Sequence, residues 1–168
     1  MAVTQQLARV SGAYLARCRA SAAAVPGADP DWDPPTDDRI DLDWSPRFIV
    51  GACELAAVGP RQLIAVKRAL EGERDVDVSV LHHAEATGSF GPPPTALAPR
   101  AVAHVAAELN ALDWDRVLAA VPAERRHSLA GAGFSGDPVS WLTDRFTALR
   151  TFYTGAAQRG LFVVLWWD

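Results

Sequence analysis

Seven aspartates lie close together in one short part of this chain, where they could act on a substrate or hold a cation: Asp29, Asp31, Asp33, Asp37, Asp38, Asp41 and Asp43. The first three alternate as at the start of a calcium-binding loop. That loop also needs a glycine at its sixth position and a glutamate at its twelfth, where this chain has Pro34 and Ile40. The sequence therefore predicts a solvated loop whose aspartates serve turns and caps. A patch for a basic partner or a weakly bound divalent cation is the alternative.

Asp41 and Asp43 are the strongest functional candidates among these carboxylates. They flank Leu42 in a segment that we expect to be extended, and alternate residues of an extended chain share one face. Trp44 follows directly and adds an indole beside the two acids. We treat these three residues as a candidate binding site for a ligand or a partner.

His82, His83 and Glu85 form a second candidate group, in which histidines adjoin a carboxylate. A metal site needs ligands that converge on one point. Adjacent histidines on a strand point to opposite faces, and on a helix only His82 and Glu85 would be neighbours. A further ligand, such as His104 or His127, would have to come from elsewhere. Ordinary surface or half-buried histidines are the simpler interpretation.

Motifs for phosphate binding and for nucleophilic catalysis are incomplete. Gly131, Gly133 and Gly136 match the spacing GxGxxG. That fingerprint works only with a strand before the first glycine and an acidic residue about twenty positions later. Residues 123–127 resemble a helix or loop, and no such acid follows. Ser135 lacks the GxSxG context of an activated serine. We therefore expect no cofactor and assign no catalytic residue.

Composition and charge are those of an ordinary globular domain. The 168 residues carry a net charge of −4, which argues against non-specific nucleic-acid binding because that binding needs a basic surface. No stretch offers the roughly 18 apolar residues of a membrane span, and no signal-peptide pattern opens the chain. Cys18 and Cys53 match no metal motif and are expected to be reduced, buried thiols. We expect a cytoplasmic protein.

Apolar spacing and capping signals predict the elements that would position these residues. We expect strands at residues 3–10, 40–43 and 76–81, and helices at 12–24, 46–56, 60–70, 99–112, 114–121 and 138–159. Ser11, Ser45 and Asp137 would cap helices, and prolines would open several of them. Short strands among several helices predict a single α+β domain over residues 1–168. It would have a small mixed or antiparallel sheet covered by helices.

The last two elements form the best-defined unit. Apolar side chains recur at three- and four-residue spacing on one helix face: Val139, Leu142, Phe146, Leu149, Tyr153 and Ala156. Gly160 can adopt the left-handed conformation that ends many helices, and an apolar run typical of a buried strand follows. Trp166 and Trp167 would then face opposite sides of the sheet. One would pack beneath the long helix, and the other would be covered by a different layer or line a groove.

Several blocks of the chain resemble the YfbM-like family of bacterial domains of unknown function. They are Leu7–Ser11, Ile40–Trp44, Pro94–Pro99 and the C-terminal pattern from Leu149 to Trp167. The resemblance implies an α+β domain of about this size and brings no activity or catalytic residue with it. The family's segment after the aspartates tends to carry a tryptophan and a histidine in the helix, whereas here Trp44 comes early and Arg47 and Phe48 follow.

The leading functional hypothesis is a non-enzymatic domain that binds a protein partner or a small ligand, as an accessory or immunity-type protein does. The candidate binding residues are Asp41, Asp43, Trp44, His82, His83, Glu85, Trp166 and Trp167. The alternative is an enzyme or metal-binding protein with a site built from Asp41, Asp43, His82 and Glu85. A third possibility is an oligomer whose aromatic surface is a self-interface.

Overall fold

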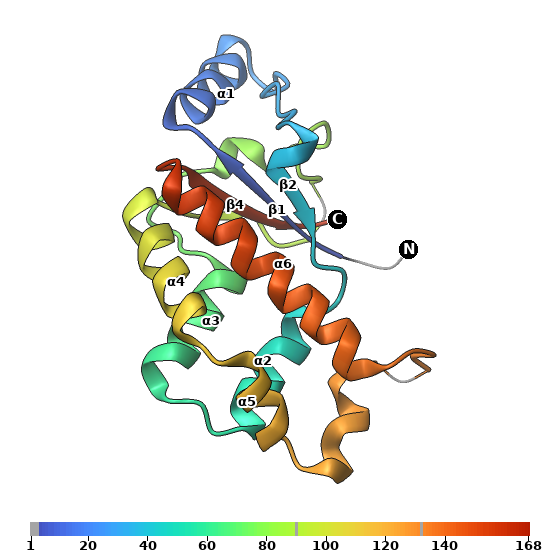
Figure 1. Ribbon diagram of the computed structural model, residues 1–168. Helices are drawn as coiled ribbons and strands as arrows, with labels where there is room; N and C mark the ends of the chain where they lie inside the picture. Colours follow the sequence, from blue (N-terminus) through green and yellow to red (C-terminus); the bar gives the residue numbers. More distant parts are fainter. Residues whose placement is uncertain (1–3, 90, 132) are drawn as a thin grey trace.

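A four-stranded antiparallel sheet in the order β2–β1–β4–β3 organises the fold in the computed structural model (Figure 1). The structure describes residues 4–89, 91–131 and 133–168. The strands are β1 (Gln5–Val10), β2 (Arg39–Asp41), β3 (Thr95–Leu97) and β4 (Phe162–Trp167). The α-helices are α1 (Gly12–Ala24), α2 (Pro46–Leu55), α3 (Pro60–Glu71), α4 (Pro99–Ala111), α5 (Trp114–Ala120) and α6 (Pro138–Gln158). Short 3₁₀ segments are η1 (Thr36–Asp38), η2 (Ser79–Leu81) and η3 (Ala123–Leu129).

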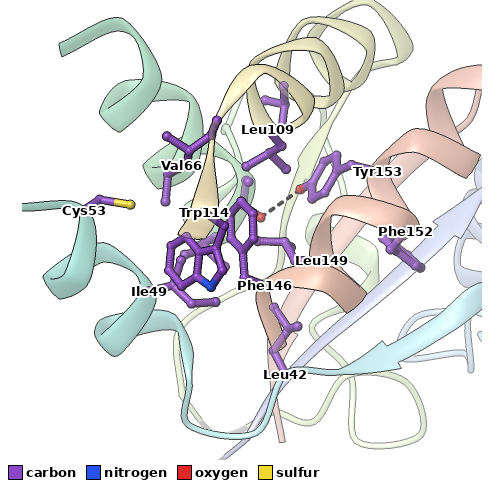
Figure 2. Close-up of a cluster of buried hydrophobic side chains, with 14 of the residues drawn as sticks. Leu42, Ile49, Cys53, Val66, Leu109, Trp114, Phe146, Leu149, Phe152 and Tyr153 are labelled. Atoms are coloured by element: carbon purple, nitrogen blue, oxygen red, sulfur yellow. Dashed lines mark hydrogen bonds between the residues drawn. The ribbon is translucent and has the colours of Figure 1, made fainter. Parts of the chain in front are cut away.

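The sheet buries a different set of side chains on each face, as expected for strands in which successive residues point to opposite sides. Leu7, Val163 and Leu165 belong to the larger cluster, which α2–α6 complete (Figure 2). In that cluster Trp114 stacks on Phe146 with ring centroids 4.1 Å apart. Ala8, Val10, Val164 and Trp166 belong to the smaller cluster, which α1, the loop around Trp32 and the residues around η2 cover. The α+β prediction is confirmed.

The central position of the last strand is also confirmed. β4 pairs with β1 along its whole length, from Phe162 opposite Val10 to Trp167 opposite Gln5, and with β3 on its other side. The pairing continues past the strands, because Thr4 and Asp168 exchange backbone hydrogen bonds of 2.8 and 3.0 Å.

The C-terminus of α3 lies where the sheet meets the helices, and side chains from three other elements complete its hydrogen bonds. The last carbonyls of a helix have no partner within the helix. Here Tyr153 of α6 donates to the Ala69 carbonyl at 2.8 Å (Figure 2). Gln5 of β1 donates to the Leu70 carbonyl, and Thr95 of β3 donates to the Glu71 carbonyl at 2.7 Å. These bonds hold α3 against both neighbouring layers.

Two local predictions are wrong, and one strand was missed. Residues 76–81 form no strand: the Asp77 carboxylate accepts from the Ser79 amide and hydroxyl, which turns the chain into η2. A short strand at Thr95–Leu97 takes the edge position instead. Ser45 precedes α2 with Pro46 as first residue, but its hydroxyl donates to the Leu42 carbonyl and does not cap the helix. The caps at Ser11 and Asp137 are as predicted.

Candidate functional site

A tight turn between β2 and α2 holds the first candidate group. The chain leaves the sheet edge after Asp41, and Asp43 adopts a left-handed conformation with φ of 60°. The Asp41 carboxylate accepts from the Asp43 amide at 2.6 Å, the bond of an Asx-turn. Asp41 and Asp43 are therefore not on one face of an extended strand, as the sequence suggested. Within this turn Leu42 is fully buried, whereas Trp44 is 38% exposed.

Arg145 of α6 joins this turn to the long helix. Its guanidinium donates to the Asp41 carbonyl at 3.2 Å and lies 3.7 Å from the Asp43 carboxylate. The Nε atom of Arg145 is buried and has no hydrogen-bond partner among the described residues. Both aspartates thus help to build the turn that carries Trp44. The Asp41 carboxylate accepts the Asx-turn bond, and the Asp43 carboxylate lies beside Arg145.

Four aromatic rings from three segments meet beside this turn, and we call them the aromatic surface: Trp44, Phe48, Phe134 and Trp141. Trp141 lies at the centre, with ring centroids 6.1 Å from Trp44, 5.9 Å from Phe48 and 5.2 Å from Phe134. Trp44 is 38% exposed, and the other three rings are half-buried. Because Trp141 contacts each of the other three rings, the four side chains form one aromatic cluster.

A groove of about 370 Å³ adjoins the aromatic surface between α2 and η3. Phe48 belongs to both features, and Arg47, Ala52, Leu55, Arg125 and Leu129 also line the groove. The Arg47 guanidinium lies over the Phe48 ring, 4.5 Å from its centroid, in a cation–π contact. The site therefore combines exposed aromatic area with positive charge.

The histidine group lies apart from the aspartates. His83 Nε2 is 3.3 Å from the Gly27 carbonyl, and His83 Nδ1 accepts from the Glu85 amide at 3.2 Å. His82 Nε2 is buried without a hydrogen-bond partner among the described residues. This loop adjoins the smaller cluster, through Leu81 and Ala86, whereas the aspartates adjoin the larger one. No hydrogen bond or ion pair joins the two groups in the described ranges.

The two C-terminal tryptophans have different surroundings. Trp166 is 4% exposed and faces the smaller cluster, where it meets Trp32 edge-on with centroids 5.9 Å apart. The Arg39 guanidinium lies 5.8 Å from the centre of the Trp166 ring. Trp167 is half-buried at the end of the sheet. Trp166 therefore packs in the core under the loop around Trp32, on the face of the sheet opposite the long helix.

The thiols offer little nucleophilic reactivity. Burial raises the pKa of Cys53 to about 12, and burial also raises the pKa of Cys18. A thiol must lose its proton to become a nucleophile. Both cysteines are free, buried and on helices, α1 and α2, as expected from the sequence.

Among the described residues, no group of three or more histidine, cysteine, aspartate or glutamate side chains is placed to hold a metal ion. The GxGxxG spacing follows η3 and not a strand, so the context of a dinucleotide-binding loop is missing in the described part of the chain. Within the same ranges no helix combines the length and apolar character needed to cross a membrane.

Sequence reasoning named Trp44 but missed the residues that surround it. Phe48 fits the apolar spacing of the helix predicted at residues 46–56, so it stood out only as a packing residue. Trp141 lies next to the main buried stripe of α6, so periodicity gave no reason to select it. One signal was available: Trp44 and Trp141 both lie within three residues of a proline that opens a helix. The chain matches no protein-family model, and it has no match among curated proteins or solved structures. The YfbM-like resemblance therefore stays a prediction.

Proposed function

We propose that this domain works by binding a protein partner through the aromatic surface, without catalysing a reaction. The observation that carries this proposal is Trp44, a large side chain 38% exposed above three half-buried rings. Tryptophan, tyrosine and arginine are the residues most enriched where protein interfaces concentrate their binding energy. Here Arg47 lies over Phe48, one of the four rings, and Arg145 lies beside Asp43, which precedes Trp44 in the chain.

The shape of the site favours a protein over a small molecule. Small-ligand sites are concave and enclose most of the ligand. The three other rings instead pack against Trp141, with centroids 5.2 to 6.1 Å from its centroid. A partner would cover Trp44 and its neighbours as a patch, while the Asp41–Asp43 turn and Arg145 hold the backbone that carries Trp44 in a fixed position. Such fixing reduces the ordering cost that binding must overcome.

Affinity capture from the native host tests this proposal with matched variants. Trp44→Ser removes the exposed indole, and Ile64→Ser removes a side chain that is 58% exposed on α3. We expect the wild type and Ile64→Ser to retain the same protein by quantitative mass spectrometry, and Trp44→Ser to lose at least tenfold of it. A tenfold loss corresponds to about 1.4 kcal/mol. Equal retention by all three proteins would reject the aromatic surface as the binding site.

A further inference from the structure

The groove between α2 and η3 carries positive charge that the protein itself does not neutralise. Arg47 and Arg125 line the groove and form no ion pair with any described residue. Glu54, an acidic residue in the lining, is already paired with Lys67 at 2.8 Å. The groove is therefore locally basic, although the whole chain has a net charge of −4.

Apolar side chains form the rest of the groove's lining. Phe48, Leu55 and Leu129 contribute aromatic or aliphatic surface to the same groove as the two guanidiniums. Leu129 is almost fully buried, so it forms part of the floor, whereas Phe48 is half-buried and continues into the aromatic surface. A ligand that suits this lining has an apolar side chain with carboxylates on either side of it.

We infer that the groove binds a short acidic segment of the protein partner, in which an apolar anchor inserts between Arg47 and Arg125 and flanking carboxylates pair with the two guanidiniums. This inference rests on the proposed function, because the groove and the aromatic surface share Phe48 and would be covered together. Guanidiniums suit this task because they pair with carboxylates through two parallel hydrogen bonds. The volume of about 370 Å³ accommodates one such anchor with its neighbours.

Selection from a random twelve-residue peptide library displayed on phage tests the inference. Three baits are used: the wild type, the double variant Arg47→Glu/Arg125→Glu, and Arg74→Glu/Arg100→Glu. The second pair serves as control because Arg74 and Arg100 are exposed and outside the groove, and the net charge changes equally. We expect wild type and control to enrich peptides in which aspartate or glutamate flanks leucine, isoleucine or phenylalanine. The groove variant should lose this enrichment at least tenfold.

Other results overturn the inference in distinguishable ways. Peptides without acidic residues, equal enrichment by the groove variant, or no enriched peptide would each exclude an acidic segment as the occupant. If Trp44→Ser still abolishes partner capture, the proposed function survives that failure. Light scattering on the same proteins detects self-association, and a dimer that only the groove variant loses would assign the groove to a second copy. Circular dichroism melts confirm that each bait is folded.

Discussion

Two helix ends in this protein have the same hydrogen bonds but different residues at the same position. After α6, Leu161 N–H donates to Ala156 and Gly160 N–H donates to Ala157, with Gly160 at φ of 62°. After α2, Val58 N–H donates to Cys53 and Ala57 N–H donates to Glu54, with Ala57 at φ of 51°. Both are Schellman motifs, which usually place glycine at the left-handed position. Ala57 therefore carries backbone strain that Gly160 avoids.

Ala57→Gly should stabilise the protein by about 1 kcal/mol, because glycine adopts a positive φ without the steric cost of a Cβ atom. Gly160→Ala is the reciprocal change and should cost about the same, since a Cβ at Gly160 would meet no atom within 4 Å and only φ is penalised. Urea denaturation of the three proteins measures both effects. Destabilisation by Ala57→Gly would mean that the gain in unfolded-chain entropy exceeds the relief of strain.

At the scale of an element, β4 serves both layers of the molecule. Val163 and Leu165 face the larger cluster, and Trp167 lies half-buried at the end of the sheet. Val164 and Trp166 face the smaller cluster. A strand buried on both faces reads as a continuous apolar run. This explains why the last strand was the easiest one to predict, and why either tryptophan was hard to assign to a layer.

Trp166→Ala should cost about 3–5 kcal/mol, because it leaves a cavity beneath Trp32 and removes an edge-on aromatic contact. Trp167→Ala should cost clearly less, since Trp167 is half-buried at the end of the sheet. Deleting residues 166–168 should cost at least as much as Trp166→Ala. Thermal melts rank the three changes, and a truncated protein with an unchanged Tm would contradict the burial of this strand.

The elements that sequence predicted well are those whose signals are local. Pro46, Pro60, Pro99 and Pro138 each open a helix, and Asp137 caps α6 through its carboxylate. The strand predicted at residues 76–81 is absent because Asp77 forms a turn, although the alternating valines suggested a strand. Thr95–Leu97 was missed because the four residues between Pro94 and Pro99 have too little pattern to indicate pairing with β4. Pairing of such a short strand depends on distant partners that local sequence does not specify.

The candidate site was only partly predictable for the same reason. Trp44 could be named because it follows two aspartates. Its contact with Trp141 depends on how α6 packs against the start of α2. The two residues are far apart in sequence, so local patterns could not predict that contact. The aspartates were correctly located beside a structured element; in the structure their hydrogen bonds shape the turn, and their part in binding stays a prediction.

At the scale of the whole molecule, Asp38 links three elements that are distant in the chain. Its carboxylate pairs with Arg9 of β1 at 2.7 Å and with Arg159 just after α6, while Asp38 itself ends η1. The Arg159 hydrogen bond, together with that of Arg9, lowers the pKa of Asp38 below its usual value. This carboxylate is therefore more stable ionised in the folded protein than in the unfolded chain.

Asp38→Asn should cost about 1–3 kcal/mol at pH 7, because two guanidiniums lose a charged acceptor. The stabilising effect of Asp38 is fully present above its unfolded pKa, near 4, and is lost as the pH falls through the lower folded value. The difference in unfolding free energy between wild type and variant should therefore shrink between pH 5 and pH 2. Urea titrations over that range measure it, with Asp75→Asn at an exposed position as control. A difference that stays constant with pH would show that the charge of Asp38 does not stabilise the fold.

The pairing of Thr4 with Asp168 brings the two ends of the described chain together, which suits a circular permutation. Thr4 and Asp168 are joined by two backbone hydrogen bonds. The paired strands β1 and β4 are separated in sequence by nearly all of the described residues. Closing so long a loop is entropically expensive and slows folding. A circular permutant that joins these neighbouring residues through a short glycine linker, and is cut at the exposed Pro26–Gly27 turn, would turn that distant pairing into a hairpin. We therefore expect this permutant to refold faster than the native chain, because its β1–β4 pairing would close a short loop.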